Sequence, residues 1–393
     1  MILYKKFGYD LYILLFAMLL MANKMATAQK INYLEADFLV GKVISNYPTF
    51  PVVNNAATLL RLRAGKSLTG YKPWHRYYNY PEMGINIVTG SLGDKNVFGH
   101  IIGVTPEMIF NQQINQKFSI SEGAGLGLSY FTKKYDEATN PTNIAIGSHV
   151  TAFGSASFML NYHYNKTLCF SLSANVLHSS NSHIALPNLG ANVPALGVGV
   201  KYSFHPVELK NDTMPKPLYD KKIHFNIKVG LGLNKQGSSI APVNGPTYPI
   251  YITSIFISKK VSYINKLQAG FEGYFNTGVY DYIISENVYD KDQKQKSYAA
   301  YIFIGHEFLF GHFSLPTIIG GYVYNPFYKS QYQLYYKNDY KAKIKNAIVM
   351  KLGFQYYLFN THIINKNQFY IGTYVKTNFG QADFWENAVG FQF

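Results

Sequence analysis

Apolar and polar residues alternate along most of this chain, and this alternation predicts β-strands. Between 169 and 180, the even positions 170, 172, 174 and 176 are apolar, whereas 171, 173 and 175 are polar. Successive side chains of a strand point to opposite faces, so this segment has one apolar and one polar face. The pattern predicts strands at about 32–45, 57–65, 82–91, 97–112, 117–131, 147–163, 166–180 and 192–205, and at 222–235, 249–261, 264–278, 294–309, 311–325, 342–360, 366–378 and 383–393.

The composition favours a β-barrel of the outer membrane. The chain has 35 tyrosines, 28 phenylalanines and 32 glycines, and its apolar residues are dispersed. In the second half, long polar connections at 236–248, 280–292 and 326–340 alternate with short ones near Val261, Gly311 and Asn365. Outer-membrane barrels have long external loops and short periplasmic turns. We therefore predict an all-β fold, an outer-membrane antiparallel β-barrel, in which the connection between 180 and 192 lies outside.

The amino terminus indicates export. Lys5 and Lys6 precede an apolar run at 11–22 and the small residues 26–28, which is the order of a secretory signal peptide cleaved after Ala28. Cys169 is the only cysteine, so an internal disulfide is excluded. The net charge of +15 suggests an anionic partner. Export and the alternating strands argue against nucleic acid and favour phosphorylated lipopolysaccharide.

The predicted strands fall into two regions, 29–205 and 222–393. The segment 206–221 contains Pro206, Pro215 and Pro217 and reads as a linker. Two eight-stranded barrels in tandem would explain this linker. We slightly favour the alternative, one barrel of about 14–16 strands with a periplasmic excursion, because tandem barrels in one chain are rare. The terminal alternation ending at Phe391 and Phe393 resembles the assembly signal of such barrels, which implies the barrel assembly machinery as a partner.

A candidate site lies where two neighbouring strands end. Continuing the even register places His178 and Ser180 on the apolar face, and Asn192 on the same face of the next strand. A catalytic serine needs a base in reach and a group that orients the base. The alternative interpretation is that these residues are ordinary interfacial polar groups, since His312-Phe313-Ser314 repeats the spacing by chance. No pattern of metal ligands or cofactor binding stands out, so neither a metal nor a cofactor is expected.

The sequence His178-Ser179-Ser180-Asn181, followed by Leu186-Pro187-Asn188-Leu189-Gly190, resembles the lipid A 3-O-deacylase (PagL) family and its acyloxyacyl hydrolase-like relatives. The family motif is His-x-Ser-Asn followed by Pro-Asn-x-Gly. The resemblance implies a barrel with an active site on its lipid-facing exterior, where a Ser–His–Glu triad cleaves an acyl ester of lipid A without a metal. It implies Ser180 as nucleophile, His178 as general base and Asn181 as a residue linked to the oxyanion hole.

This chain departs from the family at Asn192, where the resemblance places the Glu of the triad. An amide stabilises an imidazolium less than a carboxylate does, so a weaker base is expected. The rival hypothesis is a non-catalytic barrel with a degenerate site, which would be a porin, a transporter or a structural protein. Two segments receive no role. Residues 206–393 have no counterpart in the family, whose members are about as long as the first half of this chain. The aromatic cluster 74–81 is interpreted as a structured turn. The expected partners are lipid A and the outer membrane, and the sequence indicates no oligomeric state.

Overall fold

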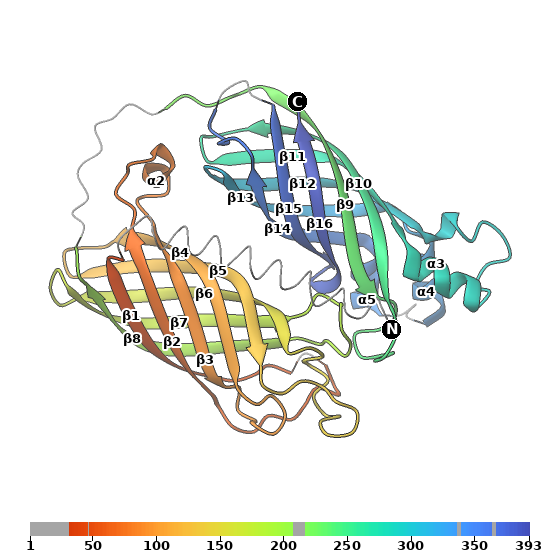
Figure 1. The fold of residues 1–393 in the computed structure, drawn as a ribbon, viewed down its shortest axis with the longest axis horizontal. Helices are drawn as coiled ribbons and strands as arrows, with labels where there is room; N and C mark the ends of the chain where they lie inside the picture. The colour runs from red at the N-terminus through yellow and green to blue at the C-terminus, as the bar shows by residue number, and fades with distance from the viewer. Residues whose placement is uncertain (1–30, 46, 207–216, 336–338, 364–366) are drawn as a thin grey trace.

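The chain forms two closed antiparallel β-barrels of eight strands each (Figure 1). The computed structural model describes residues 31–45, 47–206, 217–335, 339–363 and 367–393. The predicted signal peptide, residues 1–28, lies outside the described residues, as does most of the predicted linker. Within the described residues, no helix is long and apolar enough to cross a bilayer.

The first barrel closes on its own first and last strands. Its strands are β1 Tyr33–Gly41, β2 Ala57–Ser67, β3 Glu82–Ser91, β4 Ile101–Gln113, β5 Phe118–Phe131, β6 Val150–His163, β7 Leu168–Ser180 and β8 Ala191–Ser203. Strand β1 pairs with β8 along its whole length, from Tyr33 opposite Ser203 to Gly41 opposite Ala195. This pairing leaves no strand edge in the first barrel for the second half to join.

The second barrel closes in the same way. Its strands are β9 Ile223–Lys235, β10 Thr247–Lys260, β11 Asn265–Asn276, β12 Tyr298–Phe310, β13 Phe313–Tyr324, β14 Ile348–Tyr357, β15 Gln368–Asn378 and β16 Gln381–Gln392. Strand β16 pairs with β9, with Trp385 opposite Leu233. The favoured prediction of one large barrel is therefore wrong, and its alternative of two tandem barrels is confirmed.

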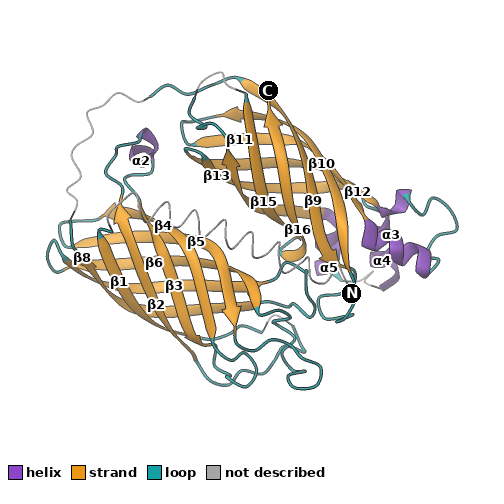
Figure 2. Ribbon diagram, viewed as in Figure 1, coloured by secondary structure: helices purple, strands orange, loops and turns teal. Residues whose placement is uncertain are grey.

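Short helices occupy connections that were expected to be irregular (Figure 2). They are α2 Pro73–Tyr77, α3 Thr277–Ser285, the 3₁₀ turn η1 Gln295–Ser297, α4 Pro326–Tyr335 and α5 Tyr340–Ala347. Helix α3 begins after Asn276, whose side chain accepts the backbone N–H groups of Gly278 and Val279. The strand predicted at 342–360 begins later, at Ile348, because α5 precedes it.

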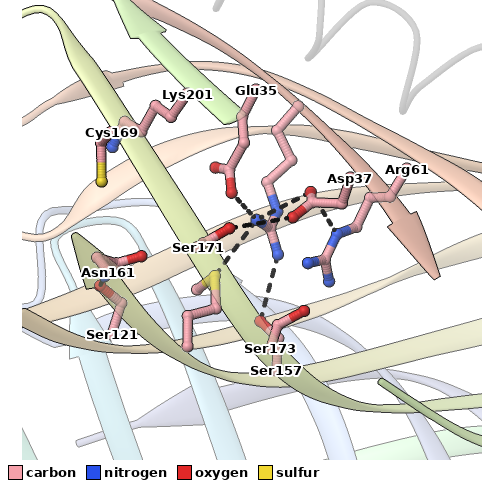
Figure 3. A network of polar contacts seen from close by, with 12 residues as sticks. Glu35, Asp37, Arg61, Ser121, Ser157, Asn161, Cys169, Ser171, Ser173 and Lys201 are labelled. Carbon is pink, nitrogen blue, oxygen red and sulfur yellow. Dashed lines mark hydrogen bonds and ion pairs between the residues drawn. The ribbon is translucent and has the colours of Figure 1, made fainter. Parts of the chain in front are cut away.

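Inward side chains form both apolar clusters, which include Leu39 and Phe153 in the first barrel and Tyr301 and Phe303 in the second, and networks of charged and polar groups. In the first barrel, Arg61 Nε lies 3.0 Å from Asp37 Oδ2, and Arg63 bridges Glu35 and Glu107 at 2.7 and 2.8 Å. Figure 3 shows Glu35, Asp37 and Arg61 converging within this barrel. In the second barrel, two lysines, Lys228 and Lys351, pair with two glutamates, Glu272 and Glu386. These groups are almost fully buried, so water does not reach them.

Most outward positions are apolar and form the lipid-facing surface of an outer-membrane barrel. Typical exposed side chains are Phe38, Leu172 and Val198 in the first barrel, and Ile302 and Ile304 in the second. The long connections, such as 132–149 and 277–297, lie at one end of the strands, and the short turns 114–117 and 311–312 lie at the other. The long connections are external in such barrels. The 181–190 connection is at this external end.

The two barrels contact each other at both ends. At the periplasmic end, the cluster 74–81 begins within α2 and continues beyond it, and Tyr77 stacks on Tyr263 of the second barrel at 5.1 Å between ring centroids. Tyr263 in turn stacks on His362 at 3.9 Å. At the external end, the N–H of Asn188 donates to the carbonyl of Ser239 at 2.7 Å. The cluster interpreted as a structured turn is therefore part of a junction between the barrels.

Candidate active site

Strands β7 and β8 bring His178 and Asn192 directly together. The two residues are opposite each other in the strand register, and both are at outward positions. His178 Nδ1 lies 2.7 Å from Asn192 Oδ1. With Nδ1–H donating to the amide oxygen, Nε2 of the ring carries the lone pair and faces away from Asn192. The structure thus brings these two predicted site residues into hydrogen-bond contact.

Ser180 lies two residues beyond His178, on the same outward face and partly exposed. Its Oγ accepts a hydrogen bond from Asn188 Nδ2 at 3.0 Å, and the Ser182 N–H lies 3.4 Å away. No hydrogen bond joins Ser180 to His178 among the contacts of the described residues. Rotation about the serine χ1 angle turns Oγ between staggered positions, and such contacts commonly tighten only when substrate is bound.

Asn181 and Asn188 make different contacts in the connection 181–190. We call this connection the nucleophile loop, because it follows the predicted nucleophile Ser180. The Asn181 side chain is buried, and its Nδ2 donates to Ala185 O at 2.7 Å and to Ser148 Oγ at 3.2 Å. Its backbone N–H donates to Asn188 Oδ1 at 3.1 Å. The Asn188 amide therefore contacts both Asn181 and Ser180. Sequence reasoning gave Asn188 no role, although its place in the Pro-Asn-x-Gly half of the motif was a signal.

Gly190 closes the nucleophile loop at a place where only glycine fits. Its φ is +72°, and a Cβ there would lie 3.0 Å from Ser179 O and 3.3 Å from His178 Cε1. Its N–H donates to Ala145 O at 3.0 Å, which ties the loop to the connection between β5 and β6. The glycine therefore allows the backbone to pass close behind the imidazole.

An apolar groove crosses the outer wall of the barrel, two residues from His178 toward the periplasmic end of β7. Alternate positions of β7 and β8 line it with Ala174, Val176, Pro194 and Leu196, and β6 adds Ala156 and Phe158. Beside the site itself, β6 places small residues, with Gly154 opposite His178 and Ala152 opposite Ser180. Lys42 is an exposed cation at the rim of the same groove.

His183 is the buried titratable group of the nucleophile loop. Burial lowers the pKa of His183, and Asp383 of the second barrel opposes this shift in part. Across the described part of the chain, no cluster of three or more His, Cys, Asp or Glu side chains is placed to hold a metal ion.

The second His-x-Ser sequence forms no comparable site. Ser314 points into the second barrel, is 1% exposed and donates to Gln355 Oε1 at 3.1 Å. His312 instead contacts the Tyr357 carbonyl at 3.0 Å. Its spacing matches that of His178 and Ser180, but its serine faces the interior and not the lipid.

Two protein-family models match the chain, one for each barrel. The family model described as lipid A 3-O-deacylase (PagL) matches residues 59–201, and the model described as acyloxyacyl hydrolase, C-terminal domain, matches residues 222–365. A comparison with curated protein sequences finds no match.

Two solved outer-membrane structures are similar to part of the chain. Neisserial surface protein A has 12% identity over 45% of this chain and 100% of its own, with a TM-score of 0.32. The outer-membrane enzyme PagL has 16% identity over 42% of this chain and 97% of its own, with a TM-score of 0.28. The two family models each match one barrel: the first barrel matches the lipid A 3-O-deacylase (PagL) family, and the second matches the C-terminal domain of acyloxyacyl hydrolases.

Proposed function

We propose that this protein is a carboxylic ester hydrolase that removes an ester-linked acyl chain from lipid A by Ser/His catalysis. The observation that carries the proposal is the outward-facing pair of His178 and Asn192, 2.7 Å apart, with Ser180 two residues away on the same lipid-facing surface. This constellation lies in the part of the chain that matches the deacylase family model. A lipid substrate meets these groups without leaving the membrane.

The proposed reaction follows the general course of serine esterases. Ser180 Oγ attacks the ester carbonyl and gives its proton to His178 Nε2, which then passes the proton to the departing alkoxide oxygen as the carbon–oxygen bond breaks. Water, deprotonated by the same imidazole, then hydrolyses the acyl-enzyme and restores Ser180. Asn192 accepts the Nδ1–H of His178 and so keeps Nε2 free to act as the base.

We propose Asn188 as the donor that stabilises the tetrahedral oxyanion. Its Nδ2 is 3.0 Å from Ser180 Oγ, and the Ser182 N–H approaches the same atom. Donors aimed at a developing oxyanion are commonly worth about 3–4 kcal/mol in catalysis. Asn181 was expected in this role, but its side chain donates hydrogen bonds to Ser148 and Ala185. We therefore propose that Asn181 stabilises the nucleophile loop.

The surface around the site suits an acylated, phosphorylated substrate. The groove near His178 offers a path for an acyl chain, because its lining is mostly apolar and includes small alanines, with Glu122 as its one carboxylate. Lys42 at the groove rim is placed to contact a phosphate of the lipid headgroup. For assembly, we propose that β16, which ends in alternating aromatic residues, is recognised by the barrel assembly machinery.

A non-catalytic barrel is the second candidate, and Asn192 is the observation that favours it. An amide in place of a carboxylate is expected where a catalytic site has decayed. A porin is disfavoured, because buried ion pairs occupy both interiors. A catalytic test on lipid A separates the two candidates.

The test is mass spectrometry of lipid A from cells that express the wild type, Ser180→Ala or Ser314→Ala. We expect loss of one acyl chain with the wild type and with Ser314→Ala, whose serine has the same His-x-Ser spacing but an interior position. Ser180→Ala should leave lipid A intact. Unchanged lipid A in cells where the wild-type protein is folded in the outer membrane would contradict the proposal and favour the non-catalytic barrel.

A further inference from the structure

The nucleophile loop of the first barrel is held by the second barrel. Two backbone hydrogen bonds cross between them: Asn188 N–H donates to Ser239 O at 2.7 Å, and Lys235 N–H donates to His183 O at 3.0 Å. Lys235 ends β9, and Ser239 lies in the connection 236–246 between β9 and β10. A loop on one barrel thus has backbone partners on the other.

One of these hydrogen bonds reaches the residue that contacts the nucleophile. Asn188 donates its side-chain amide to Ser180 Oγ and accepts the Asn181 N–H through Oδ1. Because the Asn188 backbone is anchored to Ser239, the position of its amide depends on the second barrel. A displacement of about 1 Å at a catalytic contact is enough to reduce a rate by roughly a hundredfold.

The anchor is itself fixed within the second barrel. Ser239 Oγ accepts from Gln381 Nε2 of β16 at 3.1 Å, and Ser238 N–H donates to Ala241 O at 2.8 Å. Lys235 Nζ donates to Val243 O at 3.2 Å across the same connection. These hydrogen bonds hold the connection 236–246 in place, and with it the Ser239 carbonyl that accepts from Asn188.

The nucleophile loop has an unfavourable backbone that needs such support. Ser182 and His183 have φ values of +55° and +69°, which lie in the left-handed region. Residues other than glycine occupy this region at a cost of about 1–3 kcal/mol each unless surrounding contacts enforce it. The Lys235 N–H binds the carbonyl of His183 itself, so the second barrel stabilises the strained segment directly.

The two barrels are also in contact at the other end of the molecule. Tyr77 of α2, Tyr263 and His362 form a continuous stack there, and Tyr78 Oη donates to Ile264 O at 3.4 Å. Trp74 is buried in the same cluster and packs against Phe310 at 6.0 Å between centroids. With attachments at both ends of the strands, the second barrel has a defined position relative to the nucleophile loop.

We infer that the second barrel is a positioning unit for the active site of the first, acting through Lys235 and the connection 236–246. This inference rests on the proposed esterase function. Asn188 is the group that touches Ser180, and Ser239 acts through Asn188. The catalytic barrel therefore depends on its neighbour for the geometry of the nucleophile loop, whereas the acyl groove is built from its own strands.

The test uses the full chain with residues 236–246 replaced by an Asn-Gly turn, which joins β9 to β10 as a tight hairpin. A second variant, Lys235→Pro, keeps the connection but removes the backbone donor to His183 together with the side-chain donor to Val243. The matched control is Asn244→Ala, an exposed position in the same connection. For each protein, hydrogen–deuterium exchange of residues 181–190 is measured, together with kcat and KM for lipid A and labelling of Ser180 by a long-chain fluorophosphonate. Heat-modifiable gel mobility reports that the barrels are folded.

We expect at least tenfold faster exchange at the Asn188 amide in the turn replacement, since its acceptor is gone. In both variants kcat and the labelling rate should fall at least tenfold, while KM stays within about twofold because the groove is intact. Asn244→Ala should match the wild type in every measurement.

Two results would overturn the inference. The first is unchanged exchange in residues 181–190 of the folded turn replacement. The second is faster exchange without any fall in kcat or labelling. A wild-type protein that neither deacylates lipid A nor reacts with the fluorophosphonate contradicts the proposed function instead, and the exchange measurement then still decides whether the second barrel orders the loop.

Discussion

Replacing Asn192 by Asp tests the orienting role of this residue with almost no change in shape. Aspartate places a carboxylate oxygen where the amide oxygen now lies, 2.7 Å from His178 Nδ1. A carboxylate only accepts hydrogen bonds, so it fixes the proton on Nδ1, whereas an amide that presents its NH₂ stabilises the unproductive tautomer. It also adds a negative charge beside the imidazolium that forms during attack.

The size of the effect follows from the separation and exposure of the two groups. Opposite charges about 4 Å apart attract by about 1 kcal/mol in water and about 4 kcal/mol at the effective dielectric of a protein surface. His178 is exposed and Asn192 is half-buried, so an intermediate value applies. We expect about 1.4–2.7 kcal/mol of transition-state stabilisation, which corresponds to a roughly 10- to 100-fold higher kcat.

The assay follows release of the acyl chain from lipid A by the purified protein, with kcat and KM measured across pH. The acidic limb of the Asn192→Asp rate profile should move to higher pH, because the new carboxylate favours the charged imidazole. Asn192→Ala is the control that removes the acceptor, and its kcat should fall below that of the wild type. If folded Asn192→Asp is no faster than the wild type, or if Asn192→Ala equals it, Asn192 does not orient the base.

Three further predictions concern the supporting structure. Gly190→Ala introduces a Cβ 3.0 Å from Ser179 O at a φ of +72°, at a cost of about 1–2 kcal/mol, so kcat should fall at least tenfold. The control is Gly380→Ala, with a φ of +85° and open space around it, which should retain full activity. Arg63→Met leaves Glu35 and Glu107 without their cation and should destabilise the first barrel by about 3–5 kcal/mol in thermal unfolding, an effect that the exposed-site control Lys95→Met should not show. Burial lowers the pKa of His75 to about 4 and that of His362 to about 3, and nearby lysines add to both shifts. Both rings are therefore neutral when the junction is docked. When it separates, their pKa values return to the usual value of about 6.5, and they take up protons below that pH. Docking should be constant above that pH and weaken as pH falls below it, and spin-label distances between α2 and the 261–264 turn that stay constant down to pH 4.5 would contradict this.

The sequence predicted the strands well because alternation is a local property. The same reasoning placed His178 and Asn192 on one face, and the structure brings them into contact. It did not reveal how the strands close, because closure depends on β1 recognising β8 across most of the first barrel. It also missed the contact of Asn188 with Ser180, since the path of the nucleophile loop is set by Ala145 and Ser239, which are distant in sequence.

The buried ion pairs have a consequence for how each barrel enters the membrane. In the second barrel, Lys228 on β9 meets Glu386 on β16, so this ion pair spans the seam where the sheet closes. An inserted sheet with an open seam would leave both charges facing lipid, which is strongly unfavourable. Closure pairs the first and last strands of the barrel and, in the same event, joins the Lys228–Glu272 and Lys351–Glu386 pairs into one buried network. The seam therefore behaves as an electrostatic latch, and we expect insertion to proceed to a sealed barrel without a stable half-open intermediate.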